Sequence, residues 1–401
     1  MKSVLISGAG IAGPGLAFWL KEAGFEPTIV ERAPALQSGG YVIDFWGLGY
    51  DLAERMGLIA EINRIGYHIR EVRIVNDAGH RVAGFGTTVF SELTSGRFVT
   101  LPRSALSRLL FGKVKDSVET IFGDEIVELE QQTACVRVAL KHAGERRFDL
   151  VIGADGLHSS VRKLAFGPHS QFQKHLGYAV AAFEASGYRP RDEDVYLMYG
   201  EPGRMLGRFT LHDDRTLFLF VFAAITDLPA TLEAQKKLLR DLYGRGGWEC
   251  TKILYELDRA DELYFDSVSQ IKMQNWSRGR VALVGDAAFC VSLLAGQGSA
   301  LAIIAAYVLA GELGASQGHY EQAFANYEAR LRSYIGDKQR GAERFAGAFA
   351  PRTRAGLYFR NMVVKAFAIP GLARLAVGRD IADRIELPDY QARALDRLAS
   401  A

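Results

Sequence analysis

The sequence contains little cysteine and almost no net charge. Its three cysteines, Cys135, Cys250 and Cys290, are far apart and odd in number, which indicates neither a disulfide framework nor a cysteine-based metal site. Its eight histidines show no metal-ligand spacing. The 48 basic and 46 acidic residues give a formal charge of +2, so the long-range attraction of a basic protein for nucleic acid is absent. We therefore expect no metal and no nucleic-acid partner.

We also expect no signal peptide, no internal repeats and no hydrophobic run long enough to cross a membrane. Its longest apolar tract, residues 291–313, is interrupted at 296–298, which leaves a helix of about 16 residues against the ~20 that a bilayer requires. We interpret this tract as a buried core helix, expect no integral membrane segment, and expect a cytoplasmic protein. At 401 residues, of which 49% are hydrophobic, the chain can bury a large core in two or three domains.

A glycine-rich loop follows the first predicted strand, KSVLIS at 2–7, and opens an apolar-periodic helix. The first glycine of such a loop permits a tight turn, the second lets a pyrophosphate approach the backbone, and the third lets helix and strand pack closely. A second strand ends at Glu31, 18 residues after Gly13, where a ribose hydroxyl needs an acceptor. The pattern predicts a βαβ dinucleotide site. Its loop consists of Gly8, Ala9, Gly10, Ile11, Ala12 and Gly13.

Two further motifs follow predicted strands, GADGLHSSVR at 153–162 and VALVGDAAFCVSLLAGQG at 281–298. A carboxylate just after an apolar strand usually lies at the carboxyl edge of a sheet, where ligands bind. The structural alternatives are that Asp155 belongs to an ordinary turn and that Asp286 caps a helix. The candidate site residues of these motifs are Asp155, Gly156, Arg162, Gly285, Asp286, Gly296, Gln297 and Gly298.

With its three motifs in this order, the sequence resembles the class A flavoprotein monooxygenases, single-component FAD enzymes typified by p-hydroxybenzoate and salicylate hydroxylases. The compact tetracycline-inactivating members are similar to it over most of the chain. The resemblance implies that the glycine loop, Glu31 and Arg32 hold the ADP half of a non-covalent FAD. It also implies an FAD contact for Arg103, in VTLPRSALSRLL. As surface charges, Glu31 could instead be solvated and Arg103 solvated or ion-paired.

The other motifs acquire roles through the same resemblance. Asp155 and Arg162 are linked to both FAD and nicotinamide binding, and Asp286 is expected to hold the ribityl and pyrophosphate region. The residues 296–298 start a helix under the flavin ring. The sequence departs from the family at one place: Phe289, Ser292 and Leu293 replace a common histidine and two prolines that flank the reactive edge of the flavin, and their effect stays open.

The activity that the resemblance implies is carried by the cofactor. NADPH or NADH reduces FAD, O2 then gives a flavin hydroperoxide, and its distal oxygen passes to an aromatic or polycyclic phenolic or enolic small molecule. We assign no catalytic residue, because the protein positions the substrate and excludes water. The choice between NADPH and NADH, the choice between hydroxylation and Baeyer–Villiger insertion, and the oligomeric state stay open.

Two other functions are compatible with a flavin fold. A flavin-dependent reductase or halogenase would share the fold and differ in chemistry, and a flavin-binding module would have no activity at all. Against halogenation, the sequence has no Trp-x-Trp motif, since its tryptophans are isolated at positions 19, 46, 248 and 276.

The order of motifs predicts an α/β fold in which a Rossmann-like FAD-binding domain is interleaved with an antiparallel-sheet substrate domain, followed by C-terminal helices. The FAD-binding domain is expected over 1–75, 97–168 and 274–335, the substrate-binding domain over 76–96 and 169–273, and the helical segment over 336–401. Aromatic residues on the strands of the substrate domain could line a flat apolar site, although such residues are commonly core. The candidates are Tyr199, Phe209, Phe220 and Phe222, with Tyr196 and Phe218 beside them.

The last part of the chain is amphipathic and basic. It could lie on an anionic membrane surface, as a peripheral contact. Packing across the two domains is the favoured interpretation, because protein-facing amphipathic helices are the common case. Its basic residues are Arg354, Arg360, Lys365, Arg374 and Arg379.

Overall fold

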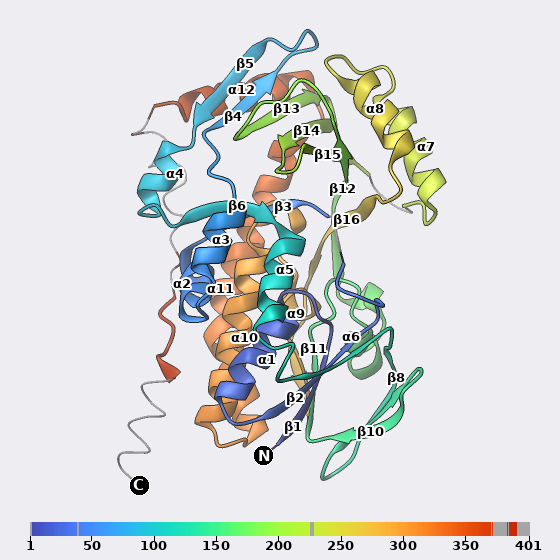
Figure 1. Ribbon diagram of the computed structural model, residues 1–401, viewed down its shortest axis with the longest axis vertical. Coiled ribbons are helices and arrows are strands. Elements are labelled where there is room, and N and C mark those ends of the chain that lie inside the picture. Colours follow the sequence, from blue (N-terminus) through green and yellow to red (C-terminus); the bar gives the residue numbers. More distant parts are fainter. Residues whose placement is uncertain are drawn as a thin grey trace.

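The computed structural model describes residues 2–37, 40–224, 228–369, 371, 383 and 385–390. Two sheets of different kinds organise it (Figure 1). The first has six strands, of which all but the edge strand β17 run parallel. Its order is β17 (Ser277–Arg278), β18 (Val281–Leu283), β11 (Leu150–Gly153), β1 (Ser3–Ser7), β2 (Glu26–Glu31) and β7 (Glu119–Phe122).

The helices beside the first sheet explain why its strands are apolar throughout. Parallel strands connected by helices are buried on both faces, and Val4, Leu5 and Ile6 of β1 have no exposed surface. Helix α1 (Ala12–Glu22) packs on the long helix α10 (Gly298–Ala315), which also contacts α2 (Gly47–Arg55) and α11 (Tyr320–Phe349). A fifth helix, α5 (Arg103–Gly112), contacts α1.

Helix α10 is the tract that the sequence analysis assigns to the core. It has 18 residues and is long and apolar enough, by length and composition, to cross a membrane, but 72% of that window is buried inside the protein. Its side chains are apolar on all sides because other helices surround it. The interpretation as a buried core helix is confirmed.

The second sheet has seven strands and is antiparallel except where β13 pairs with β4. Helices α7 (Leu232–Tyr243) and α8 (Cys250–Arg259) cover its outer face (Figure 1). Its order is β16 (Tyr264–Ile271), β12 (Gln173–Ser186), β15 (Arg215–Ala223), β14 (Arg204–Thr210), β13 (Val195–Glu201), β4 (Glu71–Val75) and β5 (Arg81–Gly86).

The chain passes between the two sheets more than once, as the predicted interleaving requires. Strands β3 (Val42–Trp46) and β6 (Phe98–Pro102) form a two-stranded sheet, and β8 (Ile126–Gln131), β9 (Val136–Leu140) and β10 (Gly144–Phe148) form a three-stranded one. The predicted fold class is confirmed. Strand β4 lies in the range 1–75 that the sequence analysis assigns to the FAD-binding domain, but it belongs to the seven-stranded sheet.

The described chain also has several short elements. Four of them are α3 (Ile59–Ile65), α4 (Thr88–Leu93), α6 (Ser160–Ala165) and a 3-10 turn, η1 (His169–Gln171). Two more lie beside the third motif, α9 (Asp286–Phe289) and the 3-10 turn η2 (Leu293–Ala295).

The C-terminal segment contacts the second sheet and the helices beside the first sheet. Helix α12 (Arg354–Ala366) packs on β5 and β13, as Figure 1 shows at the end of the second sheet. Residues 385–390 return to the helices of the first sheet, where the hydroxyl of Tyr390 donates to Glu312 over 2.6 Å. Asp383 accepts from the N–H of Leu48 over 2.8 Å and from the hydroxyl of Tyr334. Of the residues predicted to pack across the domains, Arg374 and Arg379 lie outside the described residues.

The close contact between the Tyr390 ring and helix α10 leads to the first prediction. A Cβ placed on Gly311 of α10 would lie 2.1 Å from the ring atom Cδ2 of Tyr390. We expect Gly311→Ala to lower the free energy of unfolding by about 1–3 kcal/mol through overpacking. In a Tyr390→Ala background the same substitution should become stabilising by about 1 kcal/mol, because alanine is the better helix former. Urea unfolding of the four variants checks this reversal, and equal effects in both backgrounds would contradict the proposed contact.

Candidate functional site

The three sequence motifs meet at the carboxyl edge of the six-stranded sheet. Backbone hydrogen bonds hold the ends of its central strands together: Gly8 N–H donates to Val30 over 2.7 Å, Ala154 N–H to Ser7 over 2.8 Å, and Val284 N–H to Gly153 over 2.9 Å. Because ligands of open parallel sheets bind outside this edge, the motifs are brought to the place where a nucleotide would be held.

The glycine loop presents a free helix end at this edge. Gly13 lets α1 begin against the strand, since a Cβ there would lie 1.9 Å from the carbonyl oxygen of Gly8. Helix α1 has no side-chain cap at its N-terminus, so its first N–H groups are available to a phosphate. A Cβ on Gly10 would lie 3.7 Å from Nη2 of Arg103, which places a guanidinium above the same loop. Ile11 and Ala12 are buried beneath it.

Glu31 ends β2 beside the glycine loop. Its carboxylate accepts the N–H of Ala9 over 2.7 Å and the N–H of Ala33 over 2.9 Å. It is therefore fixed at the loop, whereas the neighbouring Arg32 is exposed. This position fits the ribose acceptor that the sequence analysis expects, and the role itself stays a prediction.

Asp286 is the first residue of α9 and lies at the start of α10. A Cβ on Gly298 would lie 3.7 Å from its Oδ1 atom. Burial raises the pKa of Asp286, and the positive charge of Arg103 opposes this rise. The residue before it, Gly285, is the N-cap of α9, so Asp286 is not the cap that the structural alternative requires. Gly296 and Gln297 precede α10, whose N-terminus has no side-chain cap either.

The carboxylate of the second motif is hydrogen-bonded to other groups of the protein. The carboxylate of Asp155 accepts the hydroxyl of Ser159 and two backbone N–H groups, from Ser160 over 2.8 Å and from Val161 over 3.1 Å. Gly156 follows it with a φ of 76°. Asp155 therefore organises the first turn of α6, which joins the motif to the sheet edge.

Arg162 lies in α6 and has no exposed surface. Its guanidinium donates to the carbonyl of Leu157 over 2.6 Å and to the carbonyl of Ala287 over 2.8 Å. Ala287 is the residue after Asp286, so Arg162 ties the second motif to the third. The structure thus directs Arg162 toward the backbone, and we propose a positioning role for it in place of the direct cofactor contact.

An ion pair joins the second motif to the seven-stranded sheet. Nε2 of His158, in the motif loop, lies 3.2 Å from both carboxylate oxygens of Asp266 on β16. The hydrogen bond to Asp266 raises the pKa of His158. Neither residue is a site candidate from the sequence, because nothing in the chain indicates that positions 158 and 266 meet.

The candidate substrate residues divide between the two faces of the seven-stranded sheet. Tyr199, Phe220 and Phe222 belong to the core formed with α7 and α8 on the outer face. Phe209 lies on the inner face, where its ring centroid is 4.7 Å from that of Tyr196. Side chains alternate between the faces of a strand, and both faces of this sheet are buried, so aromatic content alone does not reveal the inner one. Of the four candidates, Phe209 alone lies on the face that Tyr41 and Tyr264 share.

Two tyrosines connect the inner face to Arg103, one of the candidate cofactor residues. Neither tyrosine is a candidate from the sequence. The ring centroids of Tyr41 and Tyr264 are 5.3 Å apart, and the backbone N–H of Arg103 donates to the carbonyl of Tyr41 over 3.0 Å. Burial raises the pKa of Tyr41 to about 12, with Arg103 opposing the rise. These residues come from distant parts of the chain, and no local pattern could have paired them.

Asp44 is a further polar group at this junction. It lies in β3 and accepts from the hydroxyl of Thr100 over 2.5 Å and from the hydroxyl of Tyr196 over 3.4 Å. Burial raises its pKa. It also lines a narrow crevice with Gln297 and Trp46. The signal in the sequence is that Asp44 is the one charged residue of the strand VIDFW.

The three departures from the family pattern form a tight turn. The ring of Phe289 packs on Trp276 with centroids 4.8 Å apart. Ser292 has a φ of 148° and its hydroxyl accepts the N–H of Leu294 over 3.3 Å, which starts η2 at Leu293. This turn packs on the inner face of the seven-stranded sheet. The turn, which is part of the third motif, is therefore a point at which that motif contacts the sheet, and its position beside a flavin ring stays a prediction.

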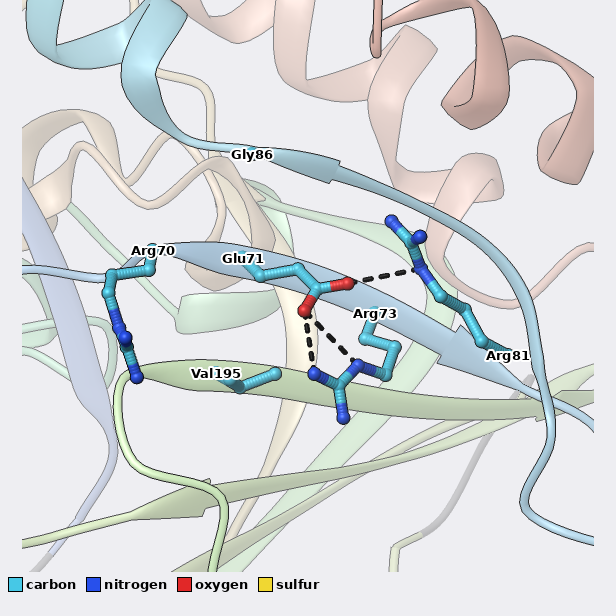
Figure 2. Close-up of a pocket in the computed structure, with 6 residues that line it drawn as sticks. All are labelled: Arg70, Glu71, Arg73, Arg81, Gly86 and Val195. Carbon is cyan, nitrogen blue, oxygen red and sulfur yellow. Dashed lines mark hydrogen bonds and ion pairs between the residues drawn. The ribbon is translucent and has the colours of Figure 1, made fainter.

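A hollow of about 480 Å³ lies elsewhere, at the β4–β5 edge of the second sheet (Figure 2). Its three arginines are paired with carboxylates, Arg73 and Arg81 with Glu71 and Arg70 with Asp194. These two carboxylates offset part of the charge of the three arginines, and no motif residue lines this hollow. In the part of the chain that the structure describes, no group of three or more histidine, cysteine or acidic residues could hold a metal ion.

The fold and the site together define a flavin-binding oxidoreductase. The pattern of the FAD-binding-domain family matches residues 1–334, and the chain belongs to this family, that of the class A flavoprotein monooxygenases. An uncharacterised protein of Mycobacterium tuberculosis (strain ATCC 25618 / H37Rv) is 39% identical, over 84% of this chain and 91% of its own. A flavin-dependent monooxygenase from an unknown prokaryotic organism is 32% identical, over 97% and 99%. The crystal structure of the tetracycline destructase Tet(51) superimposes with a TM-score of 0.83 at 29% identity, covering 97% of this chain and all of that one.

Asp286 allows a direct test of the site. We expect Asp286→Asn to weaken FAD binding about 10- to 150-fold, because a charge-assisted hydrogen bond contributes about 1.5–3 kcal/mol. Titration of the apoprotein with FAD, followed by flavin fluorescence, measures the change.

The matched control is Glu312, a buried carboxylate that accepts from Asn326, Arg330 and Tyr390 near the C-terminal end of α10, fourteen residues from Gly298. Glu312→Gln should lower the free energy of unfolding and leave FAD affinity unchanged. If Asp286→Asn behaves in the same way as the control, Asp286 is a structural residue.

Proposed function

We propose that this FAD-dependent enzyme uses NADPH or NADH and O2 to hydroxylate an aromatic or polycyclic phenolic or enolic small molecule. The observation that carries the proposal is the junction at which Arg103 is hydrogen-bonded through its backbone N–H to Tyr41, and the Tyr41 ring contacts Tyr264 at the inner face of the second sheet. The carboxylate of Asp286 is close enough to act on the pKa of both tyrosines. Cofactor residues and an apolar sheet face are thus neighbours at one place.

The residues at the sheet edge fit a non-covalent FAD. The uncapped end of α1 and the guanidinium of Arg103 offer donors to a pyrophosphate, and Glu31 offers an acceptor to a ribose. Asp286 offers a carboxylate further along the same edge, toward the start of α10. When bound, FAD supplies hydride acceptance and oxygen activation. Gly10 and Gly298 leave the backbone open on either side of it.

A transient nicotinamide partner is consistent with the rest of the chain. The sequence has one recognisable βαβ fingerprint, and FAD occupies it in this proposal. The reductant must then be held by scattered contacts. His158, in the loop of the second motif, and Arg32, whose charge acts on His158, are two exposed basic side chains at this place, and the bond to Asp266 favours the charged form of His158. Both offer positive charge to a phosphate group.

The inner sheet face supports a flat apolar substrate. Tyr196, Phe209 and Tyr264 lie on it, and Tyr41 faces them from the first domain. Tyr41 is protonated at neutral pH, as any tyrosine is, and burial raises its pKa further, so its hydroxyl can donate to a phenolate or enolate oxygen. The neighbour described as a tetracycline destructase makes a polycyclic enol one candidate within this class.

The activity is tested with the FAD-loaded enzyme. We expect NADPH or NADH oxidation and O2 consumption to rise when phenolic compounds, a tetracycline among them, are added, and the product to gain one oxygen atom from ¹⁸O2 by mass spectrometry. Cofactor oxidation without incorporation of that oxygen would identify a reductase. Bound FAD that neither nucleotide reduces would identify a binding module.

The two faces of the sheet provide a matched pair of variants. Phe209 and Phe220 are 2% and 0% exposed, so Phe209→Leu and Phe220→Leu should cost similar stability. Only Phe209→Leu, on the inner face, should raise the KM of the substrate, by about 10-fold for a partly lost apolar contact of about 1.4 kcal/mol. Steady-state kinetics measures both variants. Equal changes in KM would show that the inner face is not the substrate face.

A further inference from the structure

Helix α12 exposes a large apolar surface to solvent. Its side chains Tyr358 and Phe359 are 70% and 71% exposed, and Met362 and Val363 lie one turn further along at 48% and 36%. Ile369, just beyond the helix, is 56% exposed. Contiguous exposed aromatic and aliphatic side chains are uncommon on a monomer and mark a surface that contacts something else. We call these five residues the α12 patch.

The opposite side of α12 anchors the helix to the protein. Leu357 and Arg360 lie against Gly200 of β13, where a Cβ would be 3.4 Å from Cδ2 of Leu357 and 3.0 Å from Nη2 of Arg360. Just beyond the helix, the ring of Phe367 packs on Phe85 of β5 with centroids 5.7 Å apart. The helix, which lies at the end of the second sheet (Figure 1), is therefore held in place by one side, and the α12 patch is on its exposed side.

The charged residues of the chain segment that carries the α12 patch have one sign. Residues 344–379 contain seven basic residues and no acidic one, although the whole chain has a formal charge of only +2. Arg354 precedes Tyr358 by four residues and Lys365 follows Met362 by three, so both basic side chains flank the apolar row along the helix. Arg352 and Arg354 are exposed.

We propose that the α12 patch docks the enzyme on the surface of an anionic lipid bilayer. Aromatic and aliphatic side chains that enter the headgroup region, with lysine and arginine at the rim, are the features of helices that lie in the membrane plane. The uniform positive charge favours an anionic lipid over a second copy of this chain, since two such patches would repel each other. The proposal is independent of which substrate the enzyme oxidises.

The test is sedimentation of the FAD-loaded enzyme with vesicles. We expect binding to vesicles of phosphatidylcholine with 30% phosphatidylglycerol at ~0.15 M salt, weaker binding to pure phosphatidylcholine, and release at high salt. Arg354→Gln with Lys365→Gln should weaken partitioning about 25-fold, at roughly fivefold for each charge. Tyr358→Ser with Phe359→Ser should abolish it, because the apolar contact is lost.

The matched control is Tyr255→Ser, which changes another exposed aromatic side chain, 60% exposed, on α8. It should bind vesicles as the unchanged enzyme does, and all variants should keep their FAD content and melting temperature. Equal binding to both vesicle types, or unchanged binding of the Tyr358 and Phe359 double variant, would overturn the proposal. A dimer in sedimentation velocity that the double variant converts to monomer would also overturn it, by assigning the α12 patch to self-association.

Discussion

The site depends on how closely α1 approaches the end of β1. Gly13 rests on the carbonyl of Gly8, and the space between them admits no side chain. This contact fixes the direction in which the first N–H groups of α1 point. The other parts of the site are placed relative to it, since Glu31 is hydrogen-bonded to Ala9 and Arg103 lies above Gly10. A larger residue at position 13 would move the helix and, with it, the donors for a pyrophosphate.

Arg162 links the second motif to the third. A buried charge is costly unless its hydrogen bonds are made, and burial lowers the pKa of Arg162. Its guanidinium offsets this cost by donating to the carbonyl of Leu157, in the loop after Asp155, and to the carbonyl of Ala287, in helix α9. One buried side chain therefore holds the second and third motifs together. This contact is the basis of the positioning role that we propose for Arg162.

The sequence was sufficient for the fold class and for the meeting of the three motifs, because parallel strands place their carboxyl ends at one edge whatever their separation in the chain. It was not sufficient to tell the inner face of the second sheet, where we propose that the substrate binds, from the outer face. Strands β14 and β15 are buried on both sides, so Phe209 and Phe220 look alike in the sequence although they face opposite ways. Tyr41 and Tyr264 were not predictable for another reason: their contact depends on how the two domains pack.

The C-terminal helix shows why two interpretations of an amphipathic sequence need not exclude each other. Packing on the protein and contact with a membrane compete only if the helix has a single apolar side. In α12, Leu357 and Phe367 pack on the second sheet, while Tyr358 and Phe359 remain exposed. Because its packed side already holds α12 in place, the helix need not fold when its exposed side binds a partner surface. The conformational entropy of the α12 backbone is therefore lost during folding of the protein and not during binding.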